Sequence, residues 1–134
     1  MPYQKPSVPS RYFDAFCERI PNLEGKVFAI TGTTSGTGRV AAEVIGQKGG
    51  RVVMLNRPSV RAEAIQHAMA QDFDNDRVTS IECDLQSFAS VRRAAVQLRQ
   101  VCGETGLYAL VNNAGIMAMP DEATEDGFDT QMQT

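Results

Sequence analysis

Several classes of protein need residues that this sequence has in short supply. Its one histidine, His67, stands inside a helical pattern, and its three cysteines do not have the spacing of metal ligands. Thirteen basic against sixteen acidic residues give a net charge of −3, so no large positive field attracts nucleic acid. No apolar run approaches the about 18 residues of a membrane span, and the polar first ten residues do not look like a secretory signal. A metal centre, a nucleic-acid partner and a membrane span are therefore not indicated.

The positions of the cysteines and the chain length set further bounds. Cys83 lies in a strand-like run and Cys102 ends a helical pattern, which favours buried free thiols in a reducing compartment. We therefore expect a cytoplasmic protein, with peripheral association at a membrane left open. At 134 residues the chain is long enough for one compact domain and too short for two of ordinary size.

Residues 26–38 carry the strongest local signal, because an apolar strand-like run breaks there into a glycine-rich turn and a helical pattern follows at once. Gly32, Gly36 and Gly38 have no Cβ, so the turn can be tight and a ligand can touch the main chain. The following helix would present free N–H groups and the positive end of its dipole to an anion. This pattern predicts a nucleotide-binding turn, although it lacks the Gly-Lys-Ser/Thr ending of an ATPase phosphate loop. Taken alone, it also fits a tight strand–helix turn that binds nothing.

Strand-like runs alternate with helical patterns along the rest of the chain. The strands are expected over 27–31, 51–55, 78–83 and 107–111, and the crossover helices over about 36–48, 59–73 and 86–102. This order predicts an α/β domain with a Rossmann-type, doubly wound parallel sheet of about four strands, incomplete, over residues 24–134. Residues 1–23 form an amino-terminal extension. Within it, Tyr12, Phe13 and Phe16 predict a short amphipathic helix that packs on the domain or, alternatively, meets a membrane surface or a partner.

The residues after the first two strands point to a particular dinucleotide. Thr34, Ser35 and Thr37 add hydroxyl donors to the glycine turn. Asn56 and Arg57 follow the second strand, where a dinucleotide fold reads the ribose 2′ position. A carboxylate there would accept from a free 2′-hydroxyl, whereas Arg57 can make charge-assisted bonds to a 2′-phosphate. We expect a preference for NADP(H) over NAD(H); a solvated arginine near a helix start is the alternative.

Polar residues also follow the third and fourth strands. Asp84 can accept from the exocyclic amine of adenine while Leu85 flanks the ring; alternatively, Asp84 caps a helix that starts at Gln86. Residues 112–115, Asn-Asn-Ala-Gly, combine paired amides with two small residues. They permit close backbone approach to a sugar and can tie adjacent strands together through side-chain bonds, or they form an ordinary Asn-rich turn.

Together these motifs carry a resemblance that none carries alone. Thr-Gly-x3-Gly-x-Gly at 31–38, Asp-Leu at 84–85 and Asn-Asn-Ala-Gly at 112–115, in that order and spacing, resemble the short-chain dehydrogenase/reductase family. The segment 115–128, with Asn-Arg at 56–57, is most similar to its retinol-dehydrogenase-like branch. The resemblance implies NADP(H)-linked redox of a carbonyl and an alcohol, often on lipophilic substrates.

By motif match, the resemblance implies a role for each residue of the candidate site. The pyrophosphate would be held by five residues of the turn: Gly32, Ser35, Gly36, Thr37 and Gly38. Arg57 would hold the 2′-phosphate, and Asp84 and Leu85 the adenine. The adenosine ribose and nearby backbone would be held by Asn112, Ala114 and Gly115. Thr37 departs from the family pattern, which usually has an aliphatic residue at that position.

The residues that transfer a proton are missing from the sequence. The family uses a tyrosine with a lysine four positions on, helped by a serine and an asparagine, and none of Tyr3, Tyr12 and Tyr108 has that lysine. The family pattern places its catalytic asparagine just after Thr134, and His67 is no substitute for a general acid. We therefore expect the truncated, cofactor-binding amino-terminal half of an oxidoreductase, inactive by itself.

The resemblance also has structural implications. In the family the sheet continues with three more strands, and a helix that begins near Thr124 packs between subunits. The fourth strand would then be an exposed edge here, so we expect a marginally stable or self-associating chain. A non-catalytic dinucleotide-binding or partner-binding module is the alternative function. A methyltransferase-like fold does not account for Arg57 or for residues 112–115.

Overall fold

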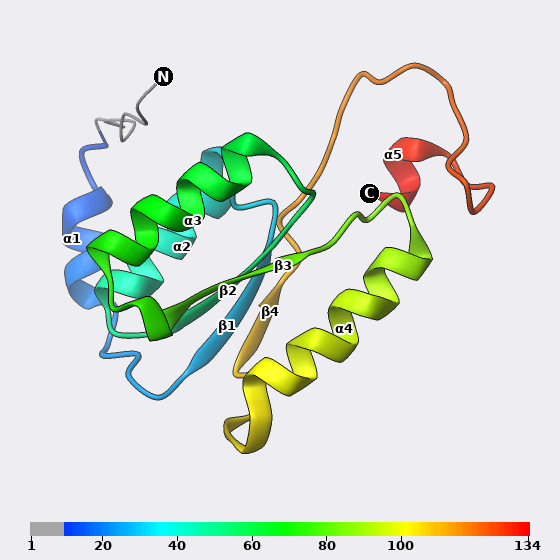
Figure 1. Ribbon diagram of the computed structural model, residues 1–134. Helices are drawn as coiled ribbons and strands as arrows, with labels where there is room; N and C mark the ends of the chain where they lie inside the picture. Colours follow the sequence, from blue (N-terminus) through cyan, green and yellow to red (C-terminus); the bar gives the residue numbers. More distant parts are fainter. Residues whose placement is uncertain (1–9) are drawn as a thin grey trace.

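Apolar strands and amphipathic helices alternate in the computed structural model, which describes residues 10–134; residues 1–9 of the expected extension lie outside the described part. Four strands form one parallel sheet in the order β3-β2-β1-β4. They are β1 (Val27–Thr31), β2 (Arg51–Asn56), β3 (Val78–Glu82) and β4 (Ala109–Val111). Helices α2 (Gly36–Gln47) and α3 (Val60–Asp72) cover one face and α4 (Phe88–Cys102) the other (Figure 1). The expected Rossmann-type architecture is confirmed.

The two central strands are buried on both faces because helices cover both sides of the sheet. Every residue of β1 is buried, as is every residue of β2 except Arg51. Successive side chains of a strand point to opposite faces, so one chain segment supplies two cores. Ile30 and Met54 pack with residues of α2 and α3, whereas Val53 and Leu55 pack with residues of α4.

The ends of several elements differ from the expected positions. β2 extends to Asn56, which pairs with Glu82 at the end of β3. β4 is shorter than the expected 107–111. Two short 3-10 turns, Asn75–Arg77 and Gly103–Thr105, precede β3 and β4. α4 begins at Phe88 instead of Gln86, because Ser87 is its N-cap and accepts a hydrogen bond from the N–H of Ser90 at 3.3 Å.

The helix of the amino-terminal extension forms, with most of its residues exposed. Helix α1 (Phe13–Arg19) has no buried residue, and Tyr12 and Phe16 are 70% and 63% exposed. The extension is attached through Leu23, which is 8% exposed and donates its N–H to the carbonyl of Lys48 at 2.8 Å. In Figure 1, α1 lies beside α2 and α3, and its Cys17 is half-buried, so the packing of α1 on the domain stays a prediction.

The last segment docks on the start of α4 by way of a turn. The helix expected near Thr124 is the four-residue α5 (Thr130–Gln133), because Gly127, at φ +83°, turns the chain and donates its N–H to the carbonyl of Thr124. A carboxylate oxygen of Asp126 accepts from the N–H of Phe88 at 2.7 Å. This bond satisfies one of the free N–H groups at the beginning of α4.

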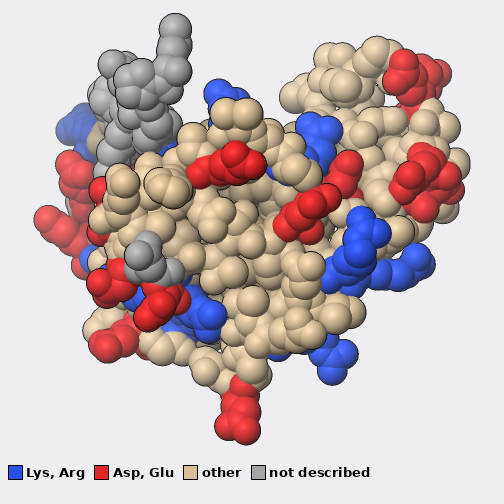
Figure 2. Space-filling view, in the orientation of Figure 1, with Lys and Arg blue, Asp and Glu red and all other residues tan. Residues whose placement is uncertain are grey.

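One edge of the sheet and the surface charge bear on possible partners. β4 is an edge strand, as expected, and its Leu110 is 50% exposed. On the face shown in Figure 2, Lys and Arg are interspersed with Asp and Glu. Cys83 and Cys102 are buried free thiols, as expected, and the reducing compartment stays a prediction. None of the described helices is both long and apolar enough to cross a membrane.

Candidate functional site

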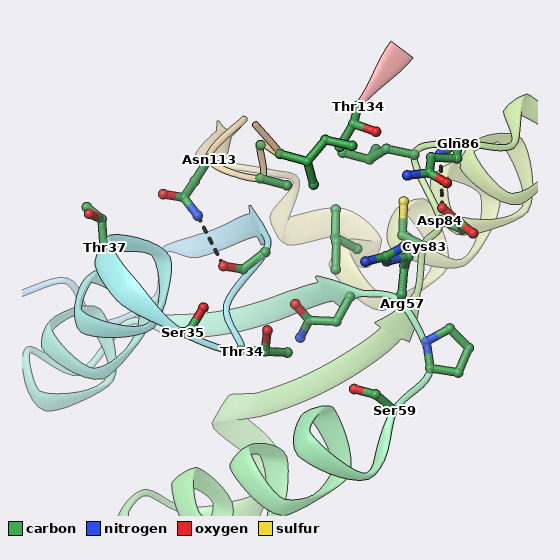
Figure 3. Close-up of a pocket in the computed structure, with 18 residues that line it drawn as sticks. Thr34, Ser35, Thr37, Arg57, Ser59, Cys83, Asp84, Gln86, Asn113 and Thr134 are labelled. Atoms are coloured by element: carbon green, nitrogen blue, oxygen red, sulfur yellow. Dashed lines mark hydrogen bonds between the residues drawn. The ribbon is translucent and has the colours of Figure 1, made fainter. Parts of the chain in front are cut away.

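A cavity of about 650 Å³ opens at the carboxyl ends of the strands, a size typical of small-molecule sites. Residues of the glycine turn lie on one side of it, and Asp84 and Gln86 on the opposite side (Figure 3). The strands are parallel, so the turn after each one reaches the same edge of the sheet. The predicted site residues that line this cavity are Gly32, Thr34, Ser35, Thr37, Asn56, Arg57, Asp84, Leu85, Ala114 and Gly115.

Three predicted site residues are not among those that line the cavity: Gly36, Gly38 and Asn112. Gly36 is the first residue of α2, and Gly38 is buried beneath the turn. Asn112 is exposed, and its neighbour Asn113 reaches the cavity in its place. Consecutive residues of an extended chain point to opposite sides, which explains why only one of the paired amides reaches the turn.

Asn113 joins the segment after β4 to the glycine turn. Its Nδ2 donates to the carbonyl oxygens of Thr31 at 2.9 Å and Gly32 at 3.1 Å. The backbone N–H groups of Asn113 and Ala114 both donate to Oγ1 of Thr31 at 3.0 Å. The expectation that the paired amides tie adjacent strands together is therefore confirmed for Asn113.

Helix α2 begins at the cavity without a capping side chain. Ser35 is its N-cap residue, but the Ser35 hydroxyl makes no capping bond, whereas Ser59 caps α3 and Ser87 caps α4. The first N–H groups of α2 and the positive end of its dipole therefore stay available to an anion. Gly36 has φ +57°, and no neighbouring atom lies within 4 Å of the position that its Cβ would take. A phosphate can thus approach the main chain closely.

Arg57 and Asp84 are the charged side chains among the described residues of the cavity wall. Arg57 is exposed and forms no salt bridge with any described residue. One carboxylate oxygen of Asp84 accepts from the N–H of Gln86 at 3.0 Å, and the N–H of Asp84 donates to Oγ of Ser90 at 3.0 Å. Asp84 is thus held in place by a local turn. The alternative expectation, that Asp84 caps the following helix, is wrong, because Ser87 is the N-cap residue of α4.

Cys83 also lines the cavity and directly precedes Asp84 in the sequence. Burial raises the pKa of its thiol, and the adjacent Asp84 carboxylate raises this pKa further. The described residues that line the cavity include no histidine, tyrosine or lysine. The polar side chains of the cavity wall and the free N–H groups at the start of α2 are suited to holding a nucleotide.

Several lining residues were missed by sequence reasoning. Most are neighbours of predicted residues and share the rule that turns after parallel strands meet at one edge: Leu55, Pro58, Ser59, Cys83, Gln86, Asn113 and Ile116. Thr134 also lines the cavity, and no local signal marks it, because α5 brings it there from a distant part of the chain.

The family model described as short chain dehydrogenase matches residues 26–134. The chain belongs to the short-chain dehydrogenase family. An uncharacterized oxidoreductase of Schizosaccharomyces pombe is 36% identical over 115 residues, which are 86% of this chain and 33% of that relative. Retinol dehydrogenase 12 of Homo sapiens is 32% identical over 127 residues, which are 95% of this chain and 40% of that relative. The short-chain dehydrogenase chain thus spans 33% to 40% of the length of these curated relatives.

Solved structures share the fold of this short-chain dehydrogenase chain. An uncharacterized protein from Mycobacterium paratuberculosis has a TM-score of 0.73 and 36% identity, with 88% of this chain and 40% of that chain covered. The NADPH-dependent 3-quinuclidinone reductase from Rhodotorula rubra has a TM-score of 0.61 and 32% identity, with 93% of this chain and 44% of that chain covered. The resemblance that the sequence motifs carry is confirmed.

Proposed function

We propose that the chain binds NADP(H) in the cavity at the carboxyl ends of its strands, as the nucleotide-binding part of an oxidoreductase that interconverts a carbonyl and an alcohol. The observation that carries this proposal is that one cavity is lined both by the turn leading into the uncapped α2 and by Arg57. The first suits a pyrophosphate and the second a 2′-phosphate. The Rhodotorula rubra reductase, which is 32% identical, is NADPH-dependent.

The cavity geometry supports the proposal that different predicted residues contact different parts of the dinucleotide. Ser35, Gly36 and Thr37, at the start of α2, are suited to hold the pyrophosphate. The second carboxylate oxygen of Asp84 is suited to accept from the adenine amine while Gln86 holds the first. These residues would bind and orient NADPH, whose chemistry would be the supply of a hydride to a carbonyl carbon.

The ribose contact is assigned to the backbone after β4. Ala114 and Gly115 line the cavity, and a Cβ on Gly115 would meet no atom within 4 Å, so a sugar can lie close to the main chain. The predicted contact through Asn112 has no support from its position. Gly38 and Asn113 would hold the turn in shape beneath the ligand.

These 134 residues are proposed to bind the dinucleotide without turning over a substrate. The sequence contains no Tyr-x-x-x-Lys, and neither Tyr12 nor Tyr108 lines the cavity. A lipophilic carbonyl or alcohol substrate would need residues beyond those present here. The free thiols support a reducing, cytoplasmic location.

A second candidate function is a binding module that associates through the edge of its sheet. β4 is an edge strand, and Leu107, Tyr108 and Leu110 are 39%, 61% and 50% exposed beside it. Unpaired backbone groups next to apolar side chains favour pairing with another strand. The same surface would allow self-association.

Titration of the purified chain with NADPH and with NADH tests the proposed function. The sequence has no tryptophan, so the fluorescence of the reduced nicotinamide is read without energy transfer from that residue. We expect tighter binding of NADPH than of NADH, and no oxidation of either in the presence of carbonyl substrates. Equal affinities for NADPH and NADH would contradict the proposal that Arg57 binds the 2′-phosphate. Turnover would contradict the claim that the chain lacks the groups for proton transfer.

A further inference from the structure

Beneath the mouth of the cavity lies a buried polar pair that the proposed function does not use. Thr33, in the glycine turn, is 0% exposed, and Asn56, at the end of β2, is 5% exposed. The N–H of Thr33 donates to Oδ1 of Asn56 at 2.8 Å, and Nδ2 of Asn56 donates to Oγ1 of Thr33 at 2.8 Å. These reciprocal bonds fasten the turn to the end of β2.

Asn56 also connects the turn to the third strand. Its carbonyl accepts from the N–H of Cys83 at 2.8 Å. The partners of Asn56 are therefore next to the groups proposed to hold the ligand. Thr33 precedes the phosphate-binding residues of the turn, Arg57 follows Asn56 directly, and Asp84 follows Cys83.

The side-chain amide of Asn56 points toward the glycine turn. In a dinucleotide fold, however, a residue at the end of this strand reads the ribose 2′ group. The oxygen and the nitrogen of the Asn56 amide each hold a bond to Thr33. The asparagine side chain is neutral and does not repel a 2′-phosphate. Its acceptor oxygen, Oδ1, already accepts a hydrogen bond from Thr33. The 2′ position is then left to Arg57.

We propose that Asn56 is a positioning residue for dinucleotide selectivity, and that its bonds to Thr33 fix the distance between the phosphate-binding turn and Arg57. This inference rests on the proposed function. NADPH must place its pyrophosphate in the turn and its 2′-phosphate at Arg57 at the same time, so it needs the two at a fixed separation. NADH has no 2′-phosphate to place at Arg57, so it can shift together with the glycine turn and still keep its pyrophosphate contacts. Loosening the pair therefore weakens NADPH binding more than NADH binding.

Two variants of different severity test the inference through the ratio of the NADH to the NADPH dissociation constant. Thr33→Val keeps the size of the side chain and removes one bond, and the ratio should fall about threefold. Asn56→Ala removes both bonds, and the ratio should fall about tenfold. If Asn56→Ala does not fold, Thr33→Val carries the test. In an Arg57→Ala background, Asn56→Ala should no longer change the ratio, because the contact that it positions is gone.

Val52→Ala is the matched control, because Val52 is a buried residue of the same strand that does not line the cavity. It should lower stability and leave the ratio unchanged. The inference would be overturned if the ratio stayed the same in the Thr33 and Asn56 variants, or if it fell as much in Val52→Ala as in those variants. Either result would leave the proposed function standing. If the unsubstituted chain bound neither dinucleotide, the proposed function would fail and this inference with it.

Discussion

Gly38 and Asn113 approach so closely that a Cβ built on Gly38 would stand 2.2 Å from Nδ2 of Asn113. The same Cβ would lie 2.5 Å from the carbonyl oxygen of Gly32, to which that Nδ2 donates. The first turn of α2 is therefore packed directly against the bond that joins the glycine turn to the segment after β4. The third glycine of the turn is required by this contact within the protein.

Replacing Gly38 with alanine should lower the free energy of unfolding by about 1–3 kcal/mol, because the added methyl group displaces Asn113 from its bonds. Unfolding in urea measures this loss. Gly115→Ala is the matched control, since no atom lies within 4 Å of its Cβ position, and it should unfold like the unsubstituted chain. A Gly38→Ala variant as stable as the unsubstituted chain would contradict the assignment.

Arg57→Ala should raise the NADPH dissociation constant by about tenfold to a hundredfold, because a hydrogen-bonded charge pair with the 2′-phosphate is lost. The NADH dissociation constant should change little. Isothermal titration at constant ionic strength compares the two, and Arg61→Ala is the control, because Arg61 is exposed on α3 and does not line the cavity. Equal losses for both dinucleotides would show that Arg57 does not read the 2′ position.

The sequence predicts the fold and most of the candidate site because both depend on a regular order of elements. β1 is apolar at successive positions and a glycine turn follows it, so its place in the centre of a covered sheet can be recognised. Arg57 and Asp84 are then placed by the rule that parallel strands end at one edge.

Features that depend on contacts between distant residues could not be predicted. Asn112 and Asn113 are chemically the same, and only the pairing of β4 with β1 decides which amide meets Thr31. The bond between Asp126 and Phe88 joins residues 38 positions apart. The exposure of Tyr12 and Phe16 on α1 also depends on what lies next to the helix in space, which its own amphipathic pattern does not reveal.

Cys83 should react with iodoacetamide more slowly than Cys17, since its thiol is buried, its pKa is raised and the thiolate is the reacting form. Mass spectrometry of the alkylated chain at pH 8 measures both rates, and added NADPH should slow Cys83 further because it lines the cavity. In urea the two rates should become similar. If Cys83 reacted as fast as Cys17 in the folded chain, this would contradict the burial and the raised pKa of the Cys83 thiol.

The same raised pKa gives a sign for the pH dependence of stability. The unfolded chain releases the Cys83 proton at a lower pH than the folded chain does, so the contribution of this group to stability should fall as the pH rises above the ordinary pKa of a cysteine thiol. Cys83→Ala should remove that part of the dependence in urea unfolding at several pH values.

Leu110→Lys should reduce association of the chain, because a charge on the exposed edge strand disfavours pairing with a second edge. Sedimentation velocity over a range of concentrations measures the effect. Val96→Lys is the control, since Val96 is 58% exposed on α4 and is not part of the edge strand. An unsubstituted chain that sediments as a monomer at every concentration and melts sharply and reversibly would argue against association through β4.

The central claim, an NADP(H) site at the carboxyl ends of the strands, is tested most directly by NMR spectroscopy of the isotope-labelled chain during titration with NADPH. Amide shifts should change at the glycine turn, at Arg57 and at residues 84–85, and 2′,5′-ADP should reproduce the change at Arg57 whereas 5′-AMP should not. Shift changes confined to other surfaces, or none at saturating NADPH, would contradict the account.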